Sequence, residues 1–358
     1  MAIFEYGEYR NEYDPPDNLV EIFENSVARY PDNPLIGEKD GAGEYQWVTY
    51  GQIALRVNNL RAGLAAIGVK AGDAVGIIAN NRKEWLIGEM AVQGLGAMYV
   101  PMYEKELVSM WKYIVKDAEI KILFVSKPEV LQKVKDFPRD IPTLKQIFLI
   151  EGAGEGSMEA LERRGAEKRV PARRPKHSDI ALLIYTSGTT GEPKGVLLSH
   201  GNLAENVKAG LAWFTNLNEK SRCISMLPWA HSFGITADLH AFLMRGASIG
   251  IMGSVETLID DLPKVRPTFM ITVPRIFNKV YNGVWAKMRE AGGLKLKLFE
   301  MALAAANAKR ETGKIGLKFK ILDRIVLKKI RDRFGGCLES AVTGSAPMNV
   351  EIAKFFID

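Results

Sequence analysis

The sequence predicts an α/β fold in which mostly parallel sheets are covered by helices. Short apolar runs alternate with amphipathic stretches along the 358 residues, and this order favours repeated βα units. The runs are apolar at nearly every position, as is typical of strands buried on both faces of a parallel sheet. With 47% hydrophobic and 25% charged residues, the composition is that of a globular protein and argues against a disordered or fibrous class.

The first half of the chain contains the clearest of these units. Residues 19–30 (LVEIFENSVARY) have helical apolar spacing that stops at Pro31, and residues 45–49 predict a short strand. An amphipathic helix is expected within residues 48–63. Buried strands are predicted at residues 74–79, 98–102 and 120–125, and each is followed by a helical stretch.

Residues 151–177 are rich in glycine and charge and poor in large apolar side chains, so they predict a connection between approximate subdomains 1–177 and 178–358. Helices are expected from Asn202, after Phe233, across most of residues 275–333, and at the end of the chain. Further strands are predicted at residues 180–185, 195–198, 223–227, 247–252, 268–273 and 338–342.

Residues 185–195 (YTSGTTGEPKG) join two of these strands with a composition that is unusual for a structural loop. A Walker phosphate loop needs G-x-x-x-x-G-K-[ST]. Counted from Gly188, the second glycine position falls on Pro193, and Gly195 stands where the hydroxyl belongs. The following GVLLSH predicts a strand, whereas a Walker loop opens onto a helix. The segment is therefore a strand-loop-strand element.

Its side chains and amides suit phosphate oxygens. The hydroxyls of Thr186, Ser187, Thr189 and Thr190 can donate hydrogen bonds, and Lys194 adds a positive charge. Gly188 and Gly191 permit a close approach of the backbone. An ordinary exposed turn has the same residue types, so composition alone leaves both interpretations open.

The same eleven residues closely resemble the signature loop of the adenylate-forming superfamily, which includes acyl-CoA synthetases, luciferases and nonribosomal adenylation domains. Further blocks resemble the family in the same order, from TYGQI, ANNRKEW and VPMYEK to LPWAHSFG, TVPRIFNKVY and VTGSAPM. The resemblance covers essentially the whole chain. The region from residue 273 to residue 348 is most similar to long-chain fatty acyl-CoA synthetases.

The resemblance implies roles for particular residues. Lys194 and the loop residues Thr186, Ser187, Gly188, Thr189, Thr190 and Gly191 correspond to the positions that hold the ATP phosphates. Thr186 also matches the position whose hydroxyl approaches Mg²⁺, and His231 matches a position close to the reacting carboxylate. The adenine would lie on the turn formed by Gly344, Ser345, Ala346 and Pro347.

Several of these residues also have structural interpretations. A histidine after a strand is often a hydrogen-bonded structural group, and a proline is common at the first position of a helix. Trp229 and Phe233 flank His231 and line the acyl tunnel in one interpretation, whereas in the other they are core aromatics. His200 is interpreted as structural.

The family reaction would use ATP, Mg²⁺ and coenzyme A to convert a fatty acid into acyl-AMP and then acyl-CoA. By this resemblance, residues 1–358 form an AMP-binding N-terminal domain that is incomplete at its C-terminal end, without the small C-terminal domain and without the carboxylate ligand of the metal. Either the chain is the front of a longer ligase, or it is a truncated product that binds nucleotide or lipid without turnover. A sibling that passes acyl-AMP to a carrier protein is a further alternative.

The formal net charge is +6, which favours an anionic partner. Residues 309–333 hold ten basic and three acidic residues with apolar residues between them. They form either a solvated helix face or an interfacial face that meets anionic lipid. No nucleic-acid-binding motif accompanies them, and the sequence leaves the oligomeric state open.

Cys223 and Cys337 are the two cysteines of the sequence and stand in no metal-ligand or disulfide spacing. This usage predicts the reducing cytoplasm, with peripheral membrane attachment as an alternative. The first residues do not have the pattern of a secretory signal, and no apolar run reaches membrane-spanning length.

Overall fold

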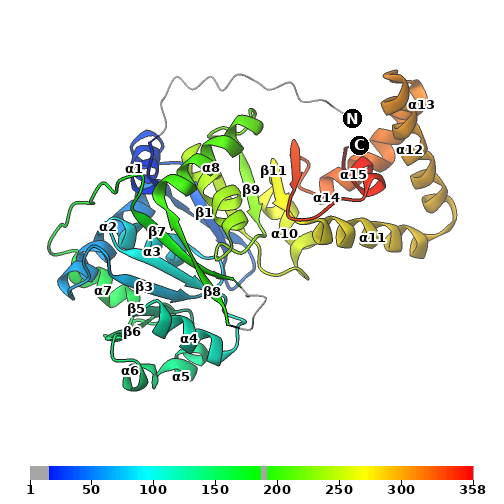
Figure 1. Cartoon of the computed structure of the whole chain (residues 1–358). Coiled ribbons are helices and arrows are strands. Elements are labelled where there is room, and N and C mark those ends of the chain that lie inside the picture. Colours follow the sequence, from blue (N-terminus) through cyan, green and yellow to red (C-terminus); the bar gives the residue numbers. More distant parts are fainter. Residues whose placement is uncertain (1–15, 187–191, 358) are drawn as a thin grey trace. The chain divides into compact units, whose positions relative to one another are not determined.

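The computed structural model describes residues 16–186 and 192–357 (Figure 1). The chain divides into two compact units. Unit 1 contains Met1–Ile36, Trp47–Lys220 and Pro228–Ser248, and unit 2 contains Gly37–Gln46, Ser221–Leu227 and Ile249–Asp358. The expected subdomain boundary after residue 177 lies inside unit 1.

Unit 1 is built on a six-stranded sheet with strand order β6-β5-β3-β4-β7-β8. Neighbouring strands run parallel except for the last pair, β7 and β8, which is antiparallel. Every residue of β3 is buried, as expected for a central strand covered on both faces. The strand bounds are β3 Ala74–Ile78, β4 Met98–Met102, β5 Ile120–Val125, β6 Gln146–Leu149, β7 Ile180–Thr186 and β8 Lys194–Ser199.

Helices cover this sheet (Figure 1). Trp111 and Val115 of α4 are fully buried in a core that includes Val100 of β4 and Leu123 of β5. The helices of unit 1 are α1 Leu19–Arg29, α2 Tyr50–Ala66, α3 Lys83–Gln93, α4 Val108–Asp117, α5 Pro128–Val134, α6 Phe137–Asp140, α7 Met158–Gly165, α8 His200–Trp213, the π-helix η1 Gly234–His240 and α9 Ala241–Met244.

The expected connection at residues 151–177 is partly wrong, because it contains α7. Ser157 caps this helix by accepting from the backbone N–H of Ala160. Met158 and Leu161 are buried, and α7 packs directly against α2. Two apolar anchors and a serine cap support this helix of two turns. Three of its charged residues are exposed, whereas Glu162 is buried and pairs with Arg56.

The second sheet has strand order β12-β11-β9-β10-β1-β2, and β11 runs parallel to both β9 and β12. In unit 2, Phe277 of α11 and Leu262 of α10 are buried in one core with Met270 of β11. The bounds are β1 Pro34–Lys39, β2 Tyr45–Thr49, β9 Arg222–Ser225, β10 Ser248–Ile251, β11 Phe269–Thr272, β12 Ser340–Thr343, α10 Leu258–Val265, α11 Pro274–Ala291, α12 Gly293–Thr312, α13 Leu317–Leu322, η2 Asp323–Leu327, α14 Lys328–Arg333 and α15 Val350–Ile357.

The α/β class with mostly parallel sheets is confirmed. Strands β2, β4 and β5 have the predicted bounds, and the other predicted strands differ by one or two residues at one or both ends. The sequence analysis missed β1, which ends in a charged pair, and β6, which is only four residues long. The long helical stretch after residue 275 is interrupted by Gly292 and Gly293 and again between Gly313 and Gly316. These breaks separate α11, α12 and the continuous run of α13, η2 and α14.

Candidate functional site

The signature segment lies at the turn of the β7–β8 hairpin. Residues 187–191, which include the predicted phosphate ligands Ser187, Gly188, Thr189, Thr190 and Gly191, are outside the described residues. Thr186 ends β7, Lys194 begins β8, and these two residues are directly opposite each other in the antiparallel register. Side chains of directly opposite residues lie on the same face of a sheet. The Thr186 hydroxyl and the Lys194 amine therefore share one face at the mouth of the loop.

Both residues are available for a ligand. The side chains of Thr186 and Lys194 are exposed, and Lys194 makes no ion pair with any residue that the structure describes. Strand β8 is the last strand of its sheet, so the hairpin end is open to solvent. A hydroxyl and a cation on one exposed face match the charge and hydrogen-bonding capacity of phosphate oxygens.

Neighbouring contacts hold the hairpin in place. The hydroxyl of Tyr185 donates to Asp117 Oδ2 at 2.6 Å, and its ring packs edge-on against Tyr113. Burial and this carboxylate together raise the pKa of Tyr185 above its usual range, so the donor stays protonated. Gly195 faces Tyr185, and a Cβ at this position would lie 2.9 Å from Leu183 Cδ1 and 3.2 Å from Tyr185 Cζ. The glycine lets the two strands pack under the tyrosine ring.

His231 lies in the turn that leads into the π-helix η1. Its ring is exposed, and Nδ1 accepts from the backbone N–H of Phe233 at 3.2 Å. A ring nitrogen that accepts a hydrogen bond carries no proton, so this contact favours the tautomer with hydrogen on Nε2. His231 is thus oriented with a donor nitrogen left for another group, which suits a site for an anionic oxygen.

Trp229 is fully buried, and its ring meets the ring of Trp85 edge-on at 5.6 Å. Its backbone N–H donates to Asn81 Oδ1 at 2.9 Å, which ties the turn to the end of β3. These contacts favour the core interpretation for Trp229. Phe233 is half-buried at the start of η1, and its role in an acyl pocket stays a prediction.

Sequence reasoning assigned no role to the residues that follow the parallel strands of unit 1. Asn81 follows β3, Glu104 follows β4, and Lys127 follows β5, at the edge of the sheet where α/β proteins bind ligands. Lys127 pairs with Glu104. Burial opposes ionisation of Glu104, but its contact with Lys127 outweighs burial and lowers its pKa. The signal was present in the ANNRKEW and VPMYEK blocks, whose polar residues come directly after apolar runs.

The predicted adenine turn belongs to unit 2. It follows β12, whose Thr343 pairs with Thr272 of β11, and the Gly344 N–H donates to the Thr272 carbonyl. Ser345 adopts a left-handed conformation with φ 68°, which is uncommon for a residue other than glycine. Ser345, Ala346 and Pro347 are exposed. Such a strained, exposed turn at the end of a parallel strand is typical of a ligand contact.

The alternative for Pro347, as the first residue of a helix, is wrong. Helix α15 begins at Val350, and the side chain of Asn349 caps it by accepting from the backbone N–H of Glu351 at 2.8 Å. Pro347 therefore lies in the turn before α15 and not at the first position of that helix.

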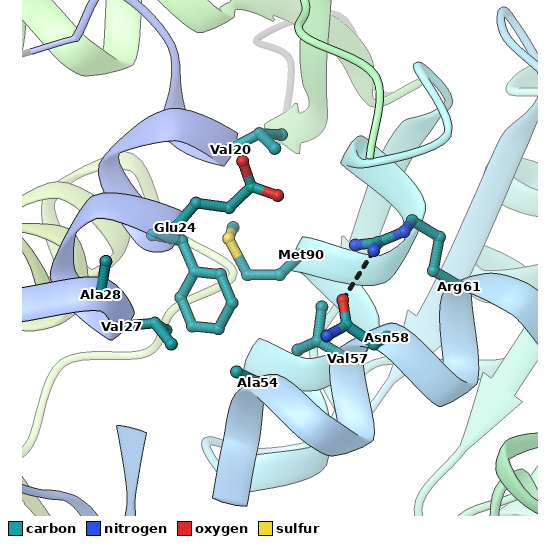
Figure 2. A pocket seen from close by; sticks show the side chains of 10 residues that line it. Val20, Glu24, Val27, Ala28, Ala54, Val57, Asn58, Arg61 and Met90 are labelled. Atoms are coloured by element: carbon teal, nitrogen blue, oxygen red, sulfur yellow. Dashed lines mark hydrogen bonds between the residues drawn. The ribbon is translucent and has the colours of Figure 1, made fainter. Parts of the chain in front are cut away.

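A pocket of about 160 Å³ lies elsewhere in unit 1, between helices α1, α2 and α3 (Figure 2). Its lining is largely apolar, with Phe23, Val57 and Met90 among the contacts. Arg61 also lines it, but its guanidinium donates to Asn58 Oδ1 and to the Val170 carbonyl. None of the predicted site residues lines this pocket.

The residues that the structure describes contain no group of three or more His, Cys, Asp or Glu side chains that could hold a metal ion. Mg²⁺ prefers six oxygen ligands and usually one or two carboxylates. Thr186 offers one neutral oxygen.

Comparison with known proteins identifies one family and relatives with related names. The sequence model of the family described as AMP-binding enzyme matches residues 23–358. Long chain acyl-CoA synthetase 7, peroxisomal, of Arabidopsis thaliana is 32% identical over 355 residues, which cover 94% of this chain and 50% of that protein. The long-chain-fatty-acid–CoA ligase FadD15 of Mycobacterium tuberculosis is 32% identical over 88% of this chain and 54% of its own length.

Solved structures show the same fold at lower identity. The adenylation domain of a carboxylate reductase from Mycobacterium chelonae aligns with a TM-score of 0.73 and 22% identity, covering 96% of this chain and 56% of that domain. A long-chain-fatty-acid-CoA ligase from Archaeoglobus fulgidus aligns with a TM-score of 0.71 and 20% identity, covering 96% of this chain and 61% of the other. The chain spans about half the length of the curated relatives that it matches.

Proposed function

Because the chain belongs to the family of AMP-binding enzymes, we propose that it carries the ATP-binding part of a long-chain-fatty-acid–CoA ligase. The observation that carries the proposal is the hairpin end, where Thr186 and Lys194 share one exposed face at the mouth of the YTSGTTGEPKG loop. Relatives named as long-chain acyl-CoA synthetases support the substrate class.

The proposed reaction has two steps. A fatty carboxylate oxygen attacks the α-phosphorus of ATP, and the bond to the bridging oxygen breaks, so that acyl-AMP forms and pyrophosphate leaves. The thiolate of coenzyme A then attacks the acyl carbonyl carbon, and AMP leaves. The first step concentrates negative charge on the leaving pyrophosphate. Lys194 and the loop hydroxyls and amides would stabilise that charge, most strongly in the transition state.

His231 and the turn at residues 344–347 supply the remaining proposed contacts. The Nε2 donor of His231 would hold an oxygen of the reacting carboxylate, since Nδ1 is already occupied by the Phe233 N–H. The exposed backbone around Ser345 would support the adenine ring. Phe233 remains a candidate acyl contact. Trp229 remains a second candidate because its backbone lies close to His231 in the sequence, although its ring is buried in the core.

Mg²⁺ would reach this site with the ATP phosphates, and the Thr186 hydroxyl would be one of its ligands. When bound, it would neutralise phosphate charge. Coenzyme A is the proposed second substrate.

We place the activity in the cytoplasm on the basis of the two cysteines, neither of which forms a disulfide. No helix in the described part of the chain is long and apolar enough to cross a membrane.

One alternative acceptor has a specific observation in its favour. The fold matches adenylation domains of carboxylate reductases, including an A-PCP didomain solved with AMP. In that case acyl-AMP would pass to a carrier protein instead of coenzyme A. A non-catalytic nucleotide- or lipid-binding protein is the third candidate.

The test begins by sequencing the gene past codon 358, which identifies the protein to be assayed. That protein is assayed for fatty-acid-dependent exchange of pyrophosphate into ATP, and then for acyl-CoA after addition of coenzyme A. We expect exchange, and we expect Lys194→Ala to lower it by at least about a hundredfold. Exposed Lys116 is the matched control, and Lys116→Ala should leave exchange unchanged.

Each outcome separates the candidates. Exchange without acyl-CoA formation would favour the carrier-protein acceptor. Absence of exchange, combined with ATP binding that Lys194→Ala weakens, would favour the non-catalytic binder. Exchange that is insensitive to Lys194→Ala would contradict the role of the hairpin.

A further inference from the structure

A strongly basic segment of the chain lies in unit 2. Residues 314–333, here called the basic segment, hold eight basic and two acidic residues, a net charge of +6. The whole chain also carries +6, from 48 basic and 42 acidic residues. The remaining residues therefore contain 40 of each sign and are neutral as a set. The segment is therefore a candidate surface for an anionic partner other than the nucleotide of the proposed site.

Most of this charge is not used inside the protein. Lys328 pairs with Asp332 and Arg331 pairs with Asp323, so the two acidic residues are already occupied. Six exposed cations of the segment make no ion pair with any described residue. They are Lys314, Lys318, Lys320, Arg324, Lys329 and Arg333.

Apolar side chains are exposed on the same segment. Helices α13, η2 and α14 follow one another without a break from Leu317 to Arg333 (Figure 1). Leu317, Ile321 and Ile325 are 74%, 51% and 43% exposed. Their spacing of four places them along one face of a helix.

The segment already has a core contact on another face. Leu322 and Leu327 are each 4% exposed and pack in one cluster with Ala302 and Ala306 of α12. This buried face holds the segment on unit 2. The apolar side chains on the exposed face are not needed for that contact, and they are unusual because solvent-facing helix positions are normally polar.

We propose that the basic segment is a docking surface for an anionic phospholipid membrane, with Leu317, Ile321 and Ile325 entering the interface and the surrounding lysines and arginines contacting lipid headgroups. Unpaired cations next to exposed aliphatic side chains are the combination that interfacial helices use. A nucleic-acid surface would need the cations but has no use for a row of exposed leucine and isoleucine. Docking is independent of the proposed ligase activity, and it would bring the protein to the surface where long-chain fatty acids partition.

The test measures co-sedimentation with vesicles of phosphatidylcholine alone and of phosphatidylcholine with phosphatidylserine. We expect binding to the anionic vesicles only, weakening with rising salt. The triple variant Lys318→Gln/Arg324→Gln/Lys329→Gln should bind at least about tenfold more weakly, because each cation near an anionic surface contributes to binding. The matched control replaces Lys116, Lys168 and Arg169 of unit 1. Like the test set, these are two lysines and one arginine that are exposed and make no ion pair with any described residue. Their triple glutamine variant should bind normally.

A second pair of variants tests the apolar contribution. Leu317→Gln/Ile321→Gln should also weaken vesicle binding, whereas Leu55→Gln/Leu107→Gln, at positions 61% and 70% exposed elsewhere, should not. Equal losses in the test and control variants would overturn the proposal. So would binding that depends on the cations alone and is equally strong to heparin or DNA, because that result describes a general polyanion surface.

The experiment is run on the 358-residue chain and on any longer protein that the gene encodes. Vesicle binding by the shorter chain that is lost in the longer one would show that another part of the protein covers this face, and would overturn the proposal. Vesicle binding needs no turnover, so failure of docking and failure of the proposed ligase activity are separate results.

Discussion

Individual residues in the candidate site are oriented by ordinary hydrogen bonds. The ring of His231 is held by the Phe233 N–H, and the neighbouring Trp229 N–H is held by Asn81. The two bonds fix one short turn from both sides. A side chain that is exposed and yet oriented in this way can contact a ligand without much further loss of conformational freedom.

This orientation gives a prediction for His231. His231→Ala should lower kcat of the exchange reaction by about a hundredfold, because it removes a donor placed for a charged oxygen. His231→Gln keeps an N–H donor and should retain more activity than alanine. The check is steady-state exchange kinetics, with the exposed histidine variant His177→Ala as control. Equal activity in His231→Ala and His177→Ala would mean that the ring has no part in the reaction.

At the scale of elements, the contact between α2 and α7 depends on two glycines. A Cβ on Gly63 would lie 2.2 Å from the Leu161 carbonyl oxygen, and a Cβ on Gly165 would lie 1.9 Å from the Asn59 carbonyl oxygen. Both obstacles are backbone atoms, so a side-chain rotation cannot relieve them. The two helix backbones approach so closely that only glycine fits.

Gly165→Ala should therefore destabilise the protein by about 1–3 kcal/mol, the usual cost of overpacking. Gly156→Ala is the matched control in the preceding turn, because a Cβ there meets nothing within 4 Å. Urea unfolding of the two variants and the wild type measures the difference. A loss in Gly165→Ala no larger than in Gly156→Ala would show that α7 adjusts its position at little cost.

At the scale of the whole molecule, burial of titratable groups links stability to pH. His200 is 1% exposed, and its Nδ1 accepts from the Leu19 backbone N–H at 3.3 Å. Burial lowers the pKa of His200 from 6.5 to about 4, although Asp179 opposes the shift. Burial alone would raise the pKa of Glu84, but the charges of Lys83, Arg82 and Arg56 lower it to about 2. Both groups are less protonated in the folded than in the unfolded chain.

The free energy of unfolding should therefore decrease as the pH is lowered through two ranges. Between pH 6.5 and 4 the unfolded chain takes up a proton at His200 that the folded chain excludes, which costs up to about 3 kcal/mol. Between pH 4.5 and 2 protonation of Glu84 adds a further loss. Denaturant unfolding from pH 7 to pH 4 measures the first window, and His200→Gln should flatten it. An unchanged pH dependence in His200→Gln would assign the loss to other groups.

The sequence by itself determined the buried strands and most of the helices, because those signals are local. The apolar run of β5 and the caps of α2 and α8 are complete within a few residues. It also determined the strand-loop-strand character of residues 185–195 and the family, since both depend on the order of residues along the chain.

Only the tertiary structure decided which residues meet. The pairing of Thr186 with Lys194, the burial of Trp229 against Trp85, and the close contact of α7 with α2 each join positions that no local pattern connects. It also decided which apolar residues of the basic segment are core and which are surface, because Leu322 and Ile321 are neighbours in sequence but face opposite environments. Periodicity gives the faces of a helix, whereas packing decides which face is covered.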